Sequence, residues 1–277
     1  MFNYPPQLPD AICETYKSIN GVALNIWRIE PECRPHQQPA LRPAILFFFG
    51  GGFRMGSPEQ FASHARYLAK RGMVAMTADY RVADRHGVKG VACLKDAKSA
   101  LQWVRANAER LGIDPLRIGA SGGSAGGYLA AATAAIPGFE DETLSVEIRR
   151  PPDALILFNP GVVMAPIPDL QMTDERLATV AERMGAVPES ISPYHHIMGN
   201  LPPTIIFHGQ ADTTIPYETV EAFTTKMHML GNRCELVGYP GEEHGFFNIG
   251  RGDGSTYQDT VGRMDQFLTS LGWLEDS

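Results

Sequence analysis

The sequence predicts an α/β fold in which a mostly parallel central sheet is covered by helices on both faces. Short, continuous apolar runs recur at residues 44–49, 154–158 and 204–207, and such runs are typical of strands buried on both faces of a parallel sheet. Amphipathic segments of helical length separate the runs, for example residues 91–111. Because strands and helices alternate along the chain, a parallel sheet with crossover helices is expected.

The elements are expected in a regular order. A hairpin comes first, because Asn20-Gly21 lies between two apolar-rich runs and favours a tight turn. A helix is expected to begin at Pro58, with Ser57 as its N-cap and Gln60 at the position that completes a capping box. The expected strands are residues 16–19, 22–27, 44–49, 73–78, 117–121, 154–158, 204–207 and 235–237, and the other expected helices are residues 91–111, 124–135, 216–230 and 257–271.

One segment interrupts this alternation. Residues 161–201 lie between two core strands and are too many for a simple crossover. They hold several prolines and four methionines, which are adaptable side chains suited to lining a pocket. We therefore expect a single α/β domain, residues 1–277, with a small cap insertion at 161–201. An ordinary crossover helix with a long loop is the alternative.

Composition and charge exclude several classes of protein. The formal net charge is -7 and no basic block occurs, which argues against binding of nucleic acid or of an anionic membrane surface. The longest apolar stretch, residues 43–49, is far too short to span a bilayer. The first residues show neither a basic start nor an apolar run before a cleavage site. A cytoplasmic protein is expected, or a secreted one if a leader was removed.

The four cysteines are expected to be free thiols in a reducing compartment. No two of them form a C-x-x-C pair, and no cluster of histidine, cysteine and carboxylate side chains suggests a metal site. No metal and no cofactor is therefore expected. The cysteines are Cys13, Cys33, Cys93 and Cys234.

The candidate nucleophile is Ser124, in the G-x-S-x-G motif at residues 122–126. The motif lies after a predicted strand and before a predicted helix, where a sharp turn exposes the serine hydroxyl. A second G-x-S-x-G at residues 119–123 would make Ser121 the nucleophile. We reject Ser121 because only two residues of strand would precede its turn and because glycines, rather than helix formers, would follow it.

Three glycines after the run at residues 44–49 predict an oxyanion hole. Acyl transfer places negative charge on a carbonyl oxygen, which backbone N–H groups can stabilise, and glycine lets the backbone approach the substrate closely. We assign the donor groups to the N–H of Gly51, Gly52 and Ala125. A merely flexible turn is the alternative.

The candidate acid and base are Asp212 and His244. Each follows a predicted strand, and the chain order serine, aspartate, histidine is that of the G-x-S-x-G enzymes. Histidine would take the serine proton and return it to the leaving group, and aspartate would fix the imidazole tautomer. Among the other histidines, His208 is expected to be structural and His64 to lie in solvent or on a helix face.

Together these motifs resemble bacterial serine esterases of the α/β-hydrolase superfamily, in particular the hormone-sensitive-lipase-like and feruloyl/acetyl-xylan esterase branches. The resemblance rests on the glycine run, residues 79–81 (DYR), 122–127, 208–212 (HGQAD) and 243–246 (EHGF). It implies an α/β-hydrolase fold. The sequence departs from the family pattern at Phe49, where histidine is usual, at Gly123, where aspartate is usual, and in its short lead-in.

The expected function is hydrolysis of short-chain carboxylic esters through an acyl-Ser124 intermediate. Short acyl groups are expected because Phe49, Phe53 and Phe246 would crowd the site, with Phe53 and Phe246 as substrate-binding residues. The partner is a small-molecule ester, and a homodimer is left open. One alternative is an esterase that acts on acylated sugars, and another is a non-catalytic ligand receptor on a hydrolase scaffold.

Overall fold

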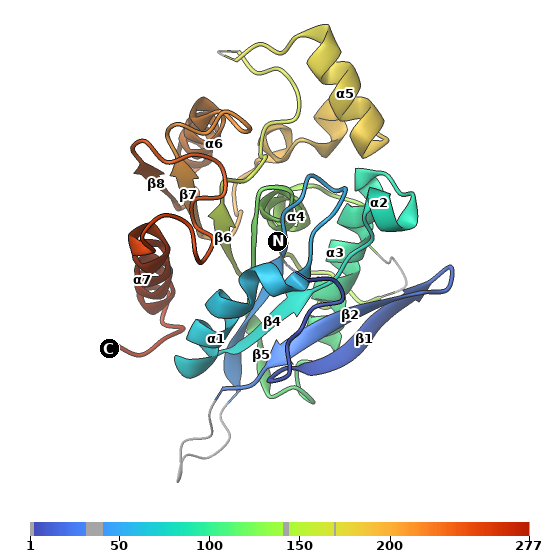
Figure 1. Cartoon of the computed structure of the whole chain (residues 1–277), viewed down its shortest axis with the longest axis vertical. Coiled ribbons are helices and arrows are strands. Elements are labelled where there is room, and N and C mark those ends of the chain that lie inside the picture. The colour runs from blue at the N-terminus through green and yellow to red at the C-terminus, as the bar shows by residue number, and fades with distance from the viewer. Residues whose placement is uncertain (1–2, 32–40, 141–143, 169, 277) are drawn as a thin grey trace.

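The computed structural model describes residues 3–31, 41–140, 144–168 and 170–276, and its centre is one sheet of eight strands (Figure 1). The strand order is β1-β2-β4-β3-β5-β6-β7-β8. β2 is antiparallel to both of its neighbours, and all later pairings are parallel. The strands are β1 Ile12–Ile19, β2 Val22–Ile29, β3 Arg42–Phe48, β4 Val74–Ala78, β5 Ile113–Gly123, β6 Ala154–Phe158, β7 Thr204–Gly209 and β8 Cys234–Tyr239.

Helices cover both faces of this sheet, which confirms the predicted architecture. The helices are α1 Ala62–Lys70, α2 Ala83–His86, α3 Gly90–Ala106, α4 Ala125–Ala135, α5 Asp174–Met184, α6 Tyr217–Met229 and α7 Ser255–Ser270, with short 3-10 turns η1 Pro58–Phe61, η2 Pro188–Ile191 and η3 Pro193–His196. Along β3, Leu46 and Phe48 pack on one face with α3, α4 and α6, whereas Ile45 and Phe47 pack on the other with α1 and α7.

Three predicted boundaries are wrong by four or five residues. The strand β1 begins at Ile12 rather than at residue 16. The long helix α3 ends at Ala106 rather than at residue 111, and the chain turns back through Gly112, whose φ is +63°. The strand β5 begins at Ile113 rather than at residue 117, because Ile113 pairs with Arg42 of β3 across an irregular register. The residues between Ile113 and Ile118 are partly or fully exposed, so the start of β5 is not part of a continuous apolar run and could not be predicted from one.

The predicted capping box is only half present. The Ser57 hydroxyl accepts a hydrogen bond from the N–H of Glu59, as an N-cap does, but the first turn is the 3-10 turn η1. Gln60 does not complete the box. Its Oε1 instead accepts a hydrogen bond of 2.6 Å from the N–H of Gly50 in the loop after β3. The glutamine therefore connects this helix start to the candidate oxyanion loop.

The segment 161–201 contains α5, η2 and η3, and α5 stands clear of the sheet at the top of Figure 1. The Thr173 hydroxyl caps the first turn of α5, and Gly185, with a φ of +72°, ends the helix. Met184 is buried against Gly90, where even a Cβ would meet its sulfur at 2.3 Å. This close contact fixes the end of α5 to the start of α3.

In the described part of the chain, no helix is long and apolar enough to cross a membrane.

Candidate active site

Ser124 occupies the turn between β5 and α4, at the carboxyl end of the central strands. Its φ of +54° is costly for a residue with a side chain. The flanking glycines permit this turn, because a Cβ at Gly122 would meet backbone atoms of residue 126 at 2.5 Å and one at Gly126 would meet the Phe48 carbonyl oxygen at 2.0 Å. The Ser124 N–H donates to the Phe158 carbonyl at 2.9 Å. The turn thus holds the hydroxyl above the sheet edge.

The structure brings Ser124, His244 and Asp212 together although they lie far apart in the sequence. His244 Nε2 lies 2.9 Å from Ser124 Oγ, and His244 Nδ1 lies 2.7 Å from Asp212 Oδ2. A carboxylate only accepts hydrogen bonds, so Nδ1 carries the imidazole proton and Nε2 is free to accept one. The arrangement can therefore move a proton from the serine hydroxyl to the imidazole.

Asp212 is held in a fixed orientation and remains ionised. Its Oδ1 accepts hydrogen bonds from the N–H groups of Thr214 and Ile215 at 2.8 and 2.9 Å. Burial alone would raise the pKa of Asp212, but hydrogen bonds from His208, His244 and the backbone of Ile215 hold that pKa well below its usual range. A carboxylate that stays charged can stabilise the imidazolium that forms when His244 takes a proton.

Ser121, the alternative nucleophile, points away from this group of residues. It is fully buried within β5, and its hydroxyl donates a hydrogen bond of 2.7 Å to the Ile156 carbonyl of β6. His208 is also buried. Its Nε2–H donates to the Ile215 carbonyl at 2.8 Å and lies 3.4 Å from Asp212 Oδ2, so it supports the loop that carries the aspartate.

The loop after β3 presents the predicted oxyanion donors. Gly51 and Gly52 have φ values of +131° and +62°, and the Gly51 carbonyl accepts hydrogen bonds from Arg54 and Met55. Within the described residues, nothing accepts a hydrogen bond from the N–H of Gly51 or Gly52. Ala125 opens α4, so its N–H likewise has no partner within its helix. Gly52 and Ala125 line the same pocket as Ser124.

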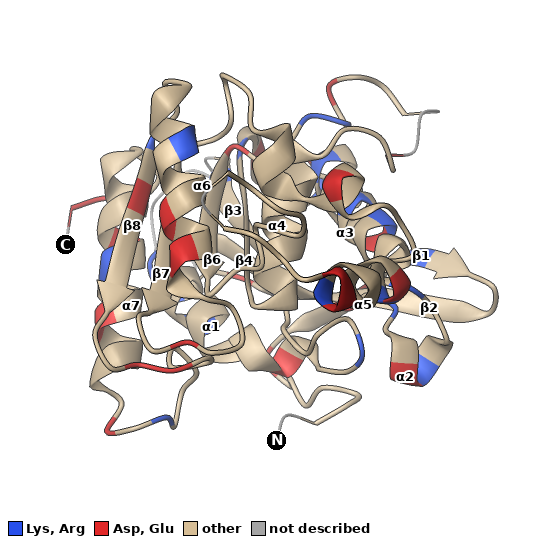
Figure 2. Ribbon diagram, turned by 90° about the horizontal axis from the view of Figure 1, so that it is seen from above, with Lys and Arg blue, Asp and Glu red and all other residues tan. Residues whose placement is uncertain are grey.

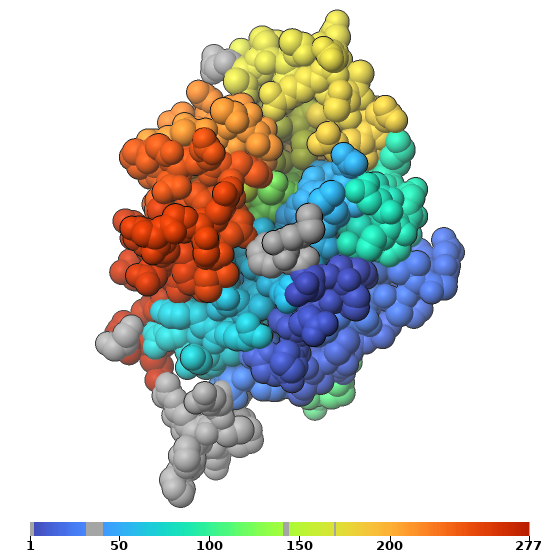
Figure 3. Space-filling view, viewed as in Figure 1, coloured from blue at the N-terminus to red at the C-terminus, as the bar shows by residue number. Residues whose placement is uncertain are grey.

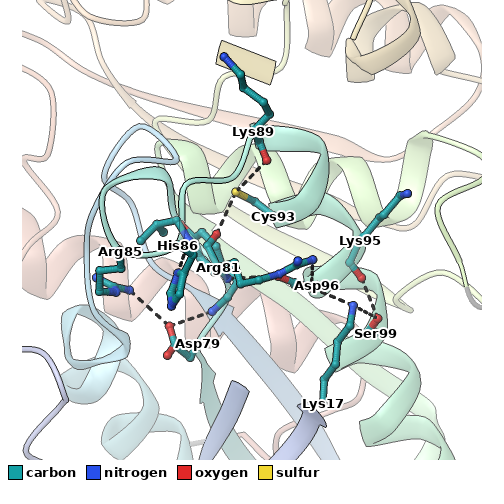
Figure 4. A network of polar contacts seen from close by, with 12 residues as sticks. Lys17, Asp79, Arg81, Arg85, His86, Lys89, Cys93, Lys95, Asp96 and Ser99 are labelled. Atoms are coloured by element: carbon teal, nitrogen blue, oxygen red, sulfur yellow. Dashed lines mark hydrogen bonds and ion pairs between the residues drawn. The ribbon is translucent and has the colours of Figure 1, made fainter. Parts of the chain in front are cut away.

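The loop is held at both ends by the segment after β4. The Tyr80 hydroxyl donates a hydrogen bond of 2.6 Å to the Phe49 carbonyl, and the two rings stack at 4.1 Å between centroids. At the other end, Arg85 donates to the Gly56 carbonyl at 2.8 Å. Asp79 accepts from the Tyr80 N–H at 2.9 Å and lies 3.6 Å from Arg85 (Figure 4). These contacts support the loop without the histidine that is usual at position 49.

A second buried ion pair lies beside this support. Arg81 donates from Nε and Nη2 to the two carboxylate oxygens of Asp96 at 2.7 and 2.9 Å, and Lys17 reaches the same carboxylate at 2.8 Å (Figure 4). Such bidentate pairs fix orientation as well as charge. Asp96 therefore joins α3, β1 and the segment after β4 and does not face the pocket.

A pocket of about 300 Å³ opens beside Ser124. Phe53, Tyr128 and Ile215 give it apolar walls, and residues of α5 also line it. Figure 3 shows a recess in this region, between the yellow segment around α5, the orange segment after β7 and the blue segment after β3. A pocket of this size is at the small end of the range for ligand sites.

Of the two phenylalanines predicted to bind substrate, the structure places only Phe53 in this pocket. Phe246 is almost completely buried, and its ring packs against Tyr239 and Phe247 on the side of the sheet covered by α1 and α7. Its nearness to His244 in the sequence is misleading, because the chain turns at Gly245, where φ is +83°.

A family model described as "alpha/beta hydrolase fold" matches residues 45–248. The chain belongs to this α/β-hydrolase family. The match confirms the predicted α/β-hydrolase fold and the resemblance to this superfamily. The chain is also similar to esterase 2 of Thermogutta terrifontis, whose apo structure is 47% identical in sequence and superposes with a TM-score of 0.92. The alignment covers the whole of both chains.

Curated relatives of the hydrolase are more distant. Esterase LipC of Mycobacterium tuberculosis is 29% identical over 264 residues, which are 90% of this chain and 62% of LipC. Carboxylesterase NlhH of the same organism is 27% identical over 238 residues, which are 78% of this chain and 71% of NlhH. The hydrolase thus spans less than two thirds of the length of LipC.

Two features of the chain were not predicted from its sequence. His64, expected in solvent or on a helix face, is fully buried among Phe61, Phe158 and Tyr257, and neither ring nitrogen has a hydrogen-bond partner among the described residues. Arg176 and Arg183 of α5 line the pocket, although their spacing alone resembles that of a solvent-exposed helix face.

Two further observations concern metals and cysteines. In residues 3–31, 41–140, 144–168 and 170–276, no group of three or more histidine, cysteine or carboxylate side chains could hold a metal ion. Cys13, Cys93 and Cys234 are free thiols, and Cys33 lies outside the described residues. Burial raises the pKa of Cys234 to about 11, so this thiol is poorly suited to act as a nucleophile.

Proposed function

We propose that this protein is a serine carboxylesterase in which Ser124 is the nucleophile, His244 the general base and Asp212 the residue that orients the base. The observation that carries the proposal is the continuous set of hydrogen bonds from Ser124 Oγ through His244 to Asp212 Oδ2. The same set of residues exists on several unrelated folds as an acyl-transfer centre, and an intact set argues against a non-catalytic receptor.

The reaction proceeds in two halves. Ser124 Oγ attacks the ester carbonyl while His244 Nε2 takes its proton, and the imidazolium then protonates the leaving alkoxide to release the alcohol. Water next attacks the acyl-serine, again with His244 as base, and the carboxylic acid leaves as the Ser124 hydroxyl is restored. Ionised Asp212 stabilises the imidazolium in both halves.

The oxyanion that forms in each half is bound by the backbone N–H groups of Gly51, Gly52 and Ala125. Support for this assignment comes from the absence of any hydrogen-bond acceptor for the two glycine N–H groups within the described residues, and from the position of Ala125 at the start of α4. The positive end of the α4 dipole adds to the stabilisation. Loss of one such donor typically costs a factor of about 10² to 10³ in kcat.

We further propose that the acyl group is short and that residues 161–201 act as a small cap over the pocket. The pocket volume of about 300 Å³ and its apolar walls favour a few methylene groups. Structures of Thermogutta terrifontis esterase 2, 46% identical to this chain, include one described as propionate bound and one described as butyrate bound. The cytoplasmic location stays a prediction from the sequence, and the homodimer stays the open alternative that the sequence leaves.

A series of p-nitrophenyl esters from acetate to dodecanoate tests this function. We expect kcat/KM to be highest for acyl groups of two to four carbons and to fall steeply at longer chain lengths. Faster hydrolysis of the twelve-carbon ester would contradict the proposed acyl specificity. A folded protein that hydrolyses none of the esters would contradict the carboxylesterase assignment itself.

A further inference from the structure

Two cationic side chains of α5, both exposed to solvent, line the pocket that holds Ser124. Arg176 and Arg183 both belong to α5 and are seven residues apart, which is two helical turns, so they lie on the same face of the helix. Thr179 and Val180 lie between them on that face, and all four residues line the pocket. Figure 2, which looks down on this end of the molecule, shows basic and acidic positions along α5.

Among the described residues, neither arginine has a carboxylate partner. The described part of the chain contains no ion pair or side-chain hydrogen bond from either guanidinium group. Several other arginines do have one: Arg66, Arg81 and Arg233 each donate two hydrogen bonds to a carboxylate. Among the described residues that line the Ser124 pocket there is no aspartate or glutamate. The charged side chains of the described cap residues that line the pocket are therefore both positive, in a protein whose net charge is -7.

The positive character continues beyond the pocket. A neighbouring groove of about 450 Å³ shares Thr179 and Arg183 with the pocket and is also lined by Arg54 and Lys89. Its one carboxylate, Glu182, lies 3.4 Å from Lys89, and both side chains of this pair are largely exposed. An exposed pair of this kind neutralises charge only weakly. Arg54 is in a similar exposed pair, since its Nε lies 3.4 Å from Asp84 Oδ1. A negatively charged ligand that enters the pocket from this side therefore passes two weakly neutralised cations and Arg183, which has no carboxylate partner among the described residues.

We propose that the substrates are esters that carry a second, negatively charged group, and that Arg176 and Arg183 bind that group as a carboxylate. The inference rests on the proposed esterase function. The apolar walls near Ser124 hold the hydrocarbon part of the substrate, while the guanidinium groups, with their planar donors, match a carboxylate held at the cap. If the acyl part of the ester carries the charge, hydrolysis yields a dicarboxylic acid. If the alcohol part carries it, hydrolysis yields an alcohol that bears a carboxylate.

Two matched substrate pairs distinguish a charge on the acyl part of the ester from a charge on its alcohol part. In the first, mono-4-nitrophenyl adipate is compared with 4-nitrophenyl 6-methylheptanoate, so that the acyl part is either anionic or neutral at equal size. In the second, 4-butyryloxybenzoate is compared with its methyl ester, so that only the alcohol part changes charge. We expect the wild type to prefer the anionic member of one pair by at least about threefold in kcat/KM, a preference that about 0.5 M salt weakens.

The decisive comparison uses the double variant Arg176→Gln/Arg183→Gln. Its ratio of kcat/KM between anionic and neutral ester should fall by about three- to tenfold, the range expected for two exposed charge contacts. The matched control, Arg233→Gln/Arg263→Gln, removes the same charge from the start of β8 and from α7, outside the pocket, and should keep the wild-type ratio.

The outcomes distinguish this inference from the function on which it rests. If the wild type hydrolyses neutral esters but shows the same ratio as the Arg176→Gln/Arg183→Gln variant, the arginines do not select charge and the inference is overturned while the esterase function stands. An equal loss in the control variant would also overturn it, because net charge alone would then explain the preference. If no ester is hydrolysed, both proposals fail.

Discussion

The imidazole of His64 should make this protein sensitive to acid. The ring is completely buried in an aromatic environment that includes Phe61, Phe158 and Tyr257, and neither nitrogen has a hydrogen-bond partner among the described residues. Burial lowers the pKa of His64 from 6.5 to about 3. The native protein therefore keeps this histidine neutral at pH values where the unfolded chain protonates it.

The size of the effect follows from this difference in pKa. Between pH 6.5 and about pH 3 the unfolded state binds one proton more than the native state, so stability falls as the pH falls through this window. At pH 5 the free energy of unfolding should be lower than at pH 8 by about 2 kcal/mol through His64 alone, since one pKa unit corresponds to about 1.4 kcal/mol.

The variant His64→Phe removes the titrating group and keeps an aromatic ring in place. Urea unfolding of wild type and variant at pH 5 and pH 8 isolates the contribution, because all other titrating groups are common to both proteins. The difference in stability between variant and wild type should grow by about 2 kcal/mol in favour of the variant from pH 8 to pH 5. A difference that stays constant with pH would refute the reasoning.

Three further predictions concern the site. Asp212→Asn should lower kcat by about 10³- to 10⁴-fold at neutral pH, because an amide can hold the wrong imidazole tautomer, and stopped-flow turnover measures this. Tyr80→Phe, which removes the hydrogen bond to the Phe49 carbonyl, should lower kcat by about three- to tenfold with little change in KM in steady-state assays. Paraoxon, which phosphorylates Thermogutta terrifontis esterase 2, should inactivate the wild type stoichiometrically, and mass spectrometry should find no adduct on Ser124→Ala.

Much of the fold and of the candidate site could be predicted because local patterns determine them. A parallel strand buried on both faces leaves a continuous apolar run, and the glycines around Ser124 are required by backbone contacts that a Cβ would break. Asp212 and His244 each follow a strand, and the carboxyl ends of parallel strands meet at one edge of the sheet. Chain order and local motifs were therefore sufficient to predict that Ser124, Asp212 and His244 lie at the same edge of the sheet.

Features that depend on packing between distant segments could not be predicted. His64 lies on a helix that would look half exposed, and only the packing of α1 against the sheet and α7 buries it. Phe246 was placed in the pocket because it is near His244, but the turn at Gly245 directs it into the core. Arg176 lines the pocket from α5, whose last residue, Met184, packs against Gly90 at the start of α3.

The identity of the nucleophile is tested most directly by comparing Ser124→Ala with Ser121→Ala in hydrolysis of p-nitrophenyl butyrate. Ser124 Oγ lies 2.9 Å from His244 Nε2, whereas the Ser121 hydroxyl is buried and bound to the Ile156 carbonyl. We expect Ser124→Ala to lose at least about 10³-fold in kcat and Ser121→Ala to retain activity within about tenfold of wild type. An inactive Ser121→Ala together with an active Ser124→Ala would contradict the proposed site.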